Sequence, residues 1–392
     1  MAITDKEKGV WGLDQVYNKI NQGSIWEYSG VPALFVWGSN DKGKLAQNNN
    51  EGAYEGYSSP VQIPGTTWQY LSQSGQKTDS RHAFATKTDG TLWSWGYNSK
   101  GQLGHNSRTQ YSSPVQIPGT TWGPYMEVSG QSSFAIKTDG TLWAWGMNDS
   151  GYGRLGLKNK TNYSSPVQIP GTTWAAIDTA NYFTTATKTD GTLWTWGYGG
   201  YGRLGLNSNT NYSSPKQVPG TTWGTSISSG NYGAGVVKTD GTLWMWGYNS
   251  NGEVGQNNRT AYSSPRQIPG TTWSKISCQY FSTLAIKTDG TLWVWGNNDQ
   301  GNLGLNSRTT YSSPVQIPGT TWNDIISTYD HSSVATKTDG TLWSWGPNGY
   351  GQLGQNNTTK YSSPTQIIGN WKASGLRQMG STQRGYMVIK EL

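Results

Sequence analysis

The stretch Lys87-Thr-Asp-Gly-Thr-Leu-Trp-Ser-Trp-Gly96 decides how this chain folds, because it returns at intervals of about fifty residues. Copies of the pattern Lys-Thr-Asp-Gly-Thr-Leu-Trp-x-Trp-Gly begin at Lys87, Lys137, Lys188, Lys238, Lys287 and Lys337. Internal repeats of this length are typical of propellers and solenoids. A residue that stands in every copy is expected to build the repeat, so function is sought where the copies differ.

Each repeat carries the signals of short antiparallel strands. In one copy, residues 134–137 and 141–145 flank a Thr-Asp-Gly turn, and Asp-Gly supplies the positive φ angles that a hairpin needs. A third strand is expected near residues 167–169 and a fourth after Trp174. Seven units of four strands predict an all-β, seven-bladed β-propeller.

The two ends of the chain each hold half of one unit. The Trp-Gly pair that ends the repeated pattern recurs in seven units, and the first of these pairs is Trp37-Gly38. The last unit stops after Tyr386-Met-Val-Ile-Lys390, where the other units continue into Thr-Asp-Gly-Thr-Leu-Trp. We expect residues near 386–390 to pair with residues near 33–37, which closes the ring and removes its exposed edge strands.

A second pattern, Trp-Gly-x-Asn-x-x-Gly-x-Leu-Gly, is clearest at Trp95-Gly-Tyr-Asn-Ser-Lys-Gly-Gln-Leu-Gly104. Over about residues 33–392 this pattern resembles the regulator of chromosome condensation repeat family. The resemblance implies a seven-bladed propeller with one blade shared between the termini. It also implies guanine-nucleotide exchange on a small GTPase and chromatin binding, through a wedge loop, an acidic surface and a basic tail. The nearly uniform loops, with one long insertion at residues 48–56, and the absence of a basic tail argue against exchange here.

Composition sets further limits. Hydrophobic residues make up only 33% of the chain, but 22 Trp and 23 Tyr provide large rings for a core. The net charge of +7 is spread along the chain, without the dense basic stripe of a nucleic-acid-binding protein. The chain lacks an apolar run of about 18 residues, so no transmembrane insertion is expected.

The sequence predicts no catalytic residue, cofactor or metal site. The recurring Lys and Asp residues are expected to form turns, and His82, His105 and His331 fall at different phases of the repeat. Cys278 stands in a strand-like stretch and is expected to be a buried small side chain. We therefore expect a protein that is not an enzyme.

Residues 1–30 do not match the repeat and are expected to form an extension ahead of a propeller domain at residues 31–392. Apolar residues recur there at spacings of three and four, which predicts one short helix. So short a helix needs a surface to pack on, either the propeller itself or another protein. The candidate docking residues are Trp11, Leu13, Val16, Tyr17, Ile20 and Trp26.

Residues 9–26 are similar to the opening segment of tailed-bacteriophage structural and tail-fibre proteins. The resemblance implies that residues 1–30 attach to other virion structural proteins, with several propellers displayed on each particle. It also implies a host surface glycan or protein as a further partner. The expected location is then the virion, with the cytoplasm as the alternative.

Two loop features are candidates for ligand binding. A ring of cations facing anionic ligands is expected from Arg108, Lys160, Arg259, Arg308, Arg154 and Arg203. Guanidinium groups suit phosphate or carboxylate, although ordinary solvated loop charges are the alternative. The loops after each Trp-Gly pair are rich in Tyr, Asn, Ser and Gly, a composition that suits protein or sugar binding.

Three functional classes follow from these features. Nearly identical repeats give little of the asymmetry that an exchange surface needs, so the sequence favours a non-enzymatic virion surface protein for decoration, tail or host contact. One alternative is an exchange factor or chromatin-binding protein like others of the repeat family. The other is a cellular propeller that binds carbohydrate or protein.

Overall fold

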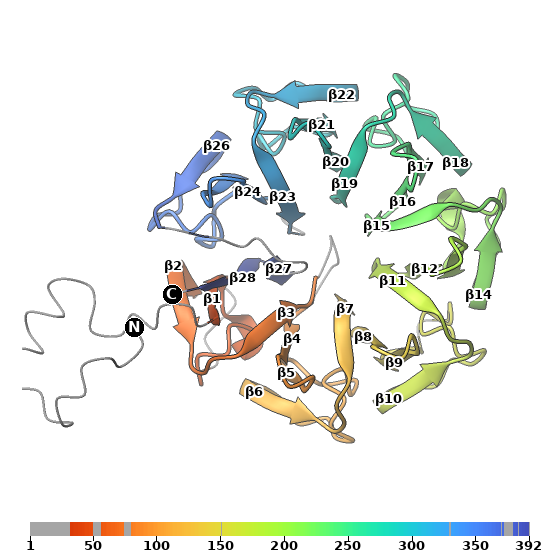
Figure 1. The fold of residues 1–392 in the computed structure, drawn as a ribbon, viewed down its shortest axis with the longest axis vertical. Helices are drawn as coiled ribbons and strands as arrows, with labels where there is room; N and C mark the ends of the chain where they lie inside the picture. The colour runs from red at the N-terminus through yellow and green to blue at the C-terminus, as the bar shows by residue number, and fades with distance from the viewer. Residues whose placement is uncertain are drawn as a thin grey trace, which may run out of the picture.

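Each repeat folds into a four-stranded antiparallel sheet, and seven such sheets form a ring in the computed structural model (Figure 1). The structure describes residues 32–49, 56–73, 80–149, 151–328, 331–369, 371, 379–382 and 384–391. The seven sheets are numbered here as blades 1–7 in chain order. The predicted all-β propeller is confirmed.

Every blade has the same strand order, with its innermost strand beside the centre of the ring (Figure 1). Blade 1 consists of β1 (Pro32–Ser39), β2 (Gly56–Ile63), β27 (Met379–Thr382) and β28 (Gly385–Glu391). Blade 2 consists of β3 (Trp68–Leu71), β4 (His82–Lys87), β5 (Leu92–Gly96) and β6 (Tyr111–Ile117). Blade 3 consists of β7 (Trp122–Ser129), β8 (Ser132–Lys137), β9 (Leu142–Gly146) and β10 (Tyr163–Ile169).

The other four blades repeat this arrangement. Blade 4 consists of β11 (Trp174–Thr179), β12 (Phe183–Lys188), β13 (Leu193–Gly197) and β14 (Tyr212–Val218). Blade 5 consists of β15 (Trp223–Ser229), β16 (Gly233–Lys238), β17 (Leu243–Gly247) and β18 (Tyr262–Ile268). Blade 6 consists of β19 (Trp273–Cys278), β20 (Ser282–Lys287), β21 (Leu292–Gly296) and β22 (Tyr311–Ile317). Blade 7 consists of β23 (Trp322–Ser327), β24 (Ser333–Lys337), β25 (Leu342–Gly346) and β26 (Tyr361–Ile367).

Blade 1 joins the two ends of the chain. Strand β1 pairs with β28 along its length, and the register places Ala33 opposite Lys390 and Trp37 opposite Tyr386. The predicted closure of the ring is confirmed. The proposed boundary between residues 30 and 31 and the predicted helix lie outside the described residues.

The antiparallel strands give the ring two faces of different construction. One face carries the tight turns between the second and third strands of each blade, such as residues 189–192, and we call it the turn face. The opposite face carries the turns between first and second strands, such as residues 180–182, and the long third-to-fourth connections, such as residues 198–211. We call it the loop face.

The Lys-Thr-Asp-Gly motif builds the turn face, as predicted. In blade 2 the Asp89 Oδ1 atom accepts hydrogen bonds from Thr91 N at 3.0 Å and Thr91 Oγ1 at 2.6 Å. The Thr91 hydroxyl oxygen in turn accepts a bond from Trp93 Nε1 at 2.9 Å. Hydrogen bonds from Thr91 hold the pKa of Asp89 below its ordinary value. The Asp carboxylate therefore stabilises the turn.

The Lys of the motif lies between two indole rings of its own blade. In blade 3 the Lys137 Nζ atom is 4.8 Å from the centre of the Trp122 ring and 4.7 Å from that of Trp143. The same arrangement recurs in blades 2 and 4–7. Blade 1 uses Lys390 between Trp371 and Phe35. These cation–π pairs help hold the first strand of a blade against the third.

Helical structure in the described part of the chain is limited to two 3₁₀ turns, Asp41–Gly43 (η1) and Gly200–Gly202 (η2). No helix among these residues has the length and apolar character needed to cross a membrane.

Candidate binding surface on the loop face

Seven equivalent backbone positions on the loop face join each blade to the next. The backbone carbonyl of the residue before Leu-Gly or Val-Gly, or before Leu45-Ala46 in blade 1, accepts a hydrogen bond from the buried indole N–H of the following blade, at 2.9–3.1 Å. The residues at this position are Lys44, Gln102, Arg154, Arg203, Glu253, Asn302 and Gln352, all buried. We call them the variable ring. Because the carbonyl makes the structural bond, the side chain is free to differ from blade to blade.

Arg203, in blade 4, shows what this position can hold. Its guanidinium carbon lies 4.6 Å from the ring centre of Tyr198, 5.4 Å from that of Tyr232 and 5.6 Å from that of Tyr201. Its Nε atom donates to the carbonyl oxygen of Gly200 at 2.8 Å. Burial lowers the pKa of Arg203, yet the aromatic faces and carbonyl groups stabilise the cation.

The predicted ring of six cations is separated into two groups. Arg108, Lys160, Arg259 and Arg308 are exposed on the long loops, whereas Arg154 and Arg203 are 4% and 1% exposed. Burial lowers the pKa of Arg154 to about 10, and its guanidinium lies 5.6 Å from the Tyr182 ring. The two buried arginines therefore face tyrosine rings and not an anion in solvent. The four exposed cations remain a predicted anion site.

An aromatic belt crosses the loop face of blades 3–6. It consists of Tyr152, Tyr182, Tyr198, Tyr201, Tyr232, Tyr248, Tyr280 and Phe281. Neighbouring rings lie 4.3–6.5 Å apart, and Tyr201 is 53% exposed. On the other side of the ring, the position of Tyr182 is held by Arg81 and Arg384, as the matching hydrogen bonds show. The loop face is thus asymmetric, contrary to what the repeats led us to expect.

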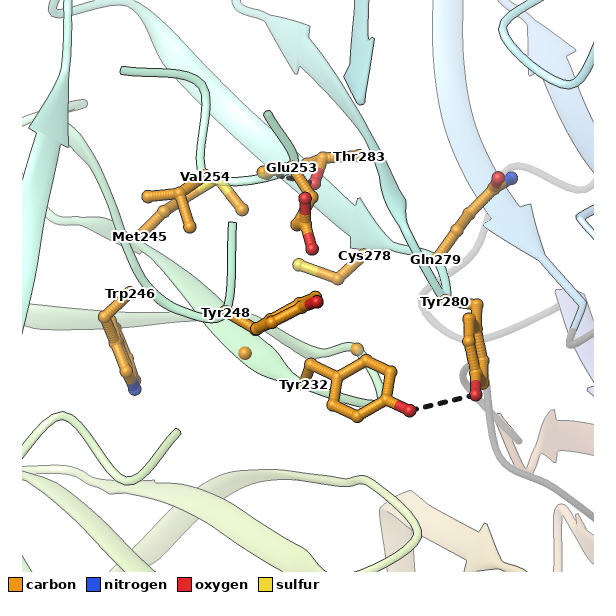
Figure 2. Close-up of a pocket in the computed structure, with 12 residues that line it drawn as sticks. Tyr232, Met245, Trp246, Tyr248, Glu253, Val254, Cys278, Gln279, Tyr280 and Thr283 are labelled. Carbon is orange, nitrogen blue, oxygen red and sulfur yellow. Dashed lines mark hydrogen bonds between the residues drawn. The ribbon is translucent and has the colours of Figure 1, made fainter. Parts of the chain in front are cut away.

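A pocket opens beside the belt between blades 5 and 6 (Figure 2). Its walls include Tyr232, Tyr248 and Tyr280, and its empty space including the open mouth is about 260 Å³. The Tyr232 and Tyr280 hydroxyl groups lie 3.1 Å apart within hydrogen-bond distance. Figure 2 shows the Glu253 carboxylate pointing toward Cys278 and Tyr248.

Glu253 is the acidic member of the variable ring and is only 8% exposed. Its Oε2 atom accepts a hydrogen bond from Asn251 N at 2.8 Å, while its buried Oε1 atom has no hydrogen-bond partner. Burial raises the pKa of Glu253 to about 7. An incompletely satisfied buried carboxylate is costly, so Glu253 and its pocket are a candidate binding site.

The remaining titratable groups offer little chemistry. Burial raises the pKa of the Cys278 thiol to about 12, so the thiolate is scarce at neutral pH. Burial lowers the pKa of His82 to about 3, and it also lowers the pKa of His105. In the described part of the chain, no group of three His, Cys, Asp or Glu side chains is arranged to hold a metal ion.

A second pocket, whose empty space including the open mouth is about 800 Å³, lies between blades 6 and 7. Trp322, Lys337 and Trp343 line it together with Pro318 and Pro364. All five belong to the repeated pattern, so this pocket follows from the construction of the blades and is a weaker candidate than the asymmetric loop face.

The sequence predicts the Tyr-rich loops after the Trp-Gly pairs as a candidate binding feature, but it predicts neither Glu253 nor the joining of these rings into one belt. Their signal is variation at fixed repeat positions, such as Arg203, Glu253 and Asn302 before Leu-Gly or Val-Gly. The predicted docking residues Trp11, Leu13, Val16, Tyr17, Ile20 and Trp26 lie outside the described residues.

The chain is similar to known propeller proteins in both sequence and fold. The family model described as the RCC1-like domain matches residues 33–383. Human protein RCC2 is 32% identical over 89 residues, which span 22% of this chain and only 17% of RCC2. Prp20p from Saccharomyces cerevisiae, whose structure was reported with its binding to Gsp1p and histones, superposes with a TM-score of 0.79 at 18% identity, over 93% of this chain and 92% of Prp20p. Human WBSCR16 superposes with a TM-score of 0.77 at 17% identity, over 92% of this chain and 99% of WBSCR16.

These matches correct the expected location. The virion location inferred from residues 9–26 is wrong, because the related proteins belong to human and yeast cells. The phage resemblance itself has no counterpart among them. The match over residues 33–383 covers most of the chain, which therefore belongs to the RCC1-like domain family.

Proposed function

We propose that this protein is a non-enzymatic binding propeller that recognises a polypeptide partner through the aromatic belt of its loop face. The observation that carries the proposal is the asymmetry of this face, where blades 3–6 bring together eight aromatic rings on an otherwise repetitive scaffold. Tyrosine rings on a rigid frame provide large contact areas at low entropic cost. Exposed aromatic groups are also enriched among residues that dominate binding energies.

The test uses peptides selected from a displayed random library on the intact protein. Tyr201→Ala removes the most exposed ring of the belt, and Ile368→Ala, at a 94% exposed residue near the turn face, is the matched control. We expect Tyr201→Ala to weaken binding of the selected peptides by about tenfold, measured by calorimetry, with no change for Ile368→Ala. Failure to select any peptide, or equal binding by both variants, would overturn the proposal.

A second candidate function is binding of a small GTPase or of histones. It is favoured by the similarity to Prp20p, whose binding to Gsp1p and histones is stated for that protein. The nearly equal lengths of the long loops in blades 2–7, none of which stands out as a wedge in its described residues, and the positive net charge count against it. Titration with Gsp1p loaded with fluorescent GDP, and separately with histones, tests it. Faster nucleotide release would establish exchange, and absence of binding to either probe would exclude this candidate for those partners.

A further inference from the structure

The Glu253 pocket has a built-in comparison in the neighbouring blade. Arg203 and Glu253 occupy the same position of the variable ring, since their carbonyl oxygens accept the indole N–H of Trp246 and Trp295 at 2.9 Å each. In blade 4 a guanidinium fills the space among the tyrosine rings. In blade 5 a carboxylate stands there, and the space beside it is open.

The two sites also share an aromatic wall. Tyr232 contacts the Arg203 guanidinium at 5.4 Å and also lines the Glu253 pocket. Tyr248 and Tyr280 also line that pocket (Figure 2). Tyr248 stands at the repeat position of Tyr198, one of the rings around Arg203. Rings of this kind attract cations through their faces. The pocket therefore has walls that suit a cation, with a carboxylate in place of one.

From this comparison we infer that the Glu253 pocket receives the side chain of an arginine from the polypeptide partner, with its guanidinium against Glu253 Oε1 and the tyrosine faces. The inference rests on the proposed function, because it names the chemistry of the partner of that same face. A planar guanidinium that enters from the open mouth of the pocket supplies the donors that the buried Oε1 atom lacks.

The pH dependence of this binding follows from the groups around the carboxylate. Tyr232, Tyr248, Tyr280 and Cys278 line the pocket, and exposed Arg259 acts on Glu253 electrostatically and lowers its pKa. Burial nevertheless raises the pKa of Glu253 to about 7. A bound guanidinium favours the ionised carboxylate, so binding releases a proton near neutral pH and is tighter at pH 8 than at pH 6.

The experiment titrates the intact protein with N-acetyl-arginine amide while the aromatic resonances of the pocket are followed by NMR. The neutral analogue N-acetyl-citrulline amide has the same shape, and N-acetyl-lysine amide carries a differently shaped cation. Glu253→Gln is tested with Asn302→Gln of blade 6 as its matched control. Both are expected to fold because Gln102 and Gln352 hold the same position in other blades.

We expect the arginine probe to bind, the citrulline probe to bind at least about tenfold more weakly, and Glu253→Gln to lose about tenfold in affinity while Asn302→Gln loses none. Glu253→Arg, which copies blade 4, abolishes binding. Equal binding of citrulline or lysine probes, or unchanged binding by Glu253→Gln, overturns the inference. If the probe binds only after Arg259→Asn, the occupant is Arg259 of the same chain and the inference is also overturned.

Peptides selected on the loop face separate this inference from the proposed function. If Tyr201→Ala weakens their binding and Glu253→Gln does not, the loop face binds a partner but the pocket does not hold its arginine. If the arginine probe binds at Glu253 and no peptide is selected, the pocket has the inferred chemistry and the proposed function fails.

Discussion

The turn face and the loop face are ends of the same strands, yet they are conserved to different degrees among the seven repeats. On the turn face, each Lys lies between two aromatic rings. In each of the six tight turns, the Asp carboxylate accepts hydrogen bonds from the Thr two residues later. On the loop face, a backbone carbonyl accepts the hydrogen bond that joins two blades, and the charge of the side chain at that position differs between blades. It is positive at Arg203 and negative at Glu253. Internal repetition therefore separates what holds the ring together from what is free to bind.

Opening the ring is the change expected to have the largest effect on stability. Deleting residues 385–392 removes β28, which pairs with β1 on one side and β27 on the other. We expect loss of the cooperative thermal transition measured by circular dichroism, because the ring opens and exposes edge strands. Removal of Leu392 alone, beyond β28, is the control. A truncated protein that melts like the intact one would show that the blades are stable without closure.

The closure could be predicted from the sequence because it depends on local pattern. Residues 33–37 and residues 386–390 each hold the half of the repeat that the other lacks, so their pairing can be recognised without knowledge of the rest of the structure. The Asp-Gly turns could likewise be assigned, since their hydrogen bonds span only two residues.

The loop face could not be assembled in this way. The rings around Arg203 come from three loops, and nothing in the spacing of Tyr182, Tyr198 and Tyr232 states that they converge on one guanidinium. Charged residues in loops are usually solvated, so Arg154 and Arg203 were expected to face an outside ligand. Their burial depends on aromatic neighbours from adjacent blades, which only the three-dimensional arrangement reveals.

Substitution of Glu253 is expected to change the free energy of unfolding more than substitution of the buried Trp145 or of the repeated Lys. The residue that we propose for binding is therefore one that lowers stability at neutral pH. Its pKa is raised from an ordinary 4.5 to about 7, so the folded protein keeps a proton that the unfolded chain has lost between these pH values. The stability contributed by this group is fully present below pH 4.5 and is lost as the pH rises through about 7.

We therefore expect Glu253→Gln to stabilise the protein relative to the original at pH 8, by about 3 kcal/mol, and to have little effect at pH 4. Urea unfolding at both pH values measures the difference. Asn302→Gln is the control, because it changes the same ring position without a titrating group. A difference that does not depend on pH would show that the carboxylate titrates normally in the folded state.

The indole bonds between blades are expected to have the next largest effect. Trp145 is fully buried, and its Nε1 atom donates to the Gln102 carbonyl of the preceding blade at 2.9 Å. Trp145→Phe removes this bond, leaves the Ser133 hydroxyl as the other donor to that carbonyl at 2.8 Å, and creates a cavity. We expect the substitution to lower the free energy of unfolding by about 2 kcal/mol.

Trp143→Phe, in the same strand, is the matched control for Trp145→Phe. Its Nε1 atom bonds to Thr141 within the same turn, and its side chain is only half-buried. Chemical denaturation should therefore show a smaller loss for Trp143→Phe. An equal loss would mean that the contact between blades adds nothing beyond the size of the indole.

The smallest effect on stability is expected from substitution of the repeated Lys on the turn face, and we expect this effect to be the same in every blade. Lys137→Met and Lys287→Met keep the aliphatic contact with the two Trp rings but remove the charge, which lies 4.5–4.9 Å from the ring centres. Each substitution should lower the free energy of unfolding by about 1 kcal/mol. The control, Arg308→Met at an exposed loop residue, should change it by less. Both Lys residues make the same contacts in different blades, so equal losses are expected. Unequal losses would mean that the blades are not equivalent on the turn face, and they would contradict the distinction between a uniform turn face and a varied loop face.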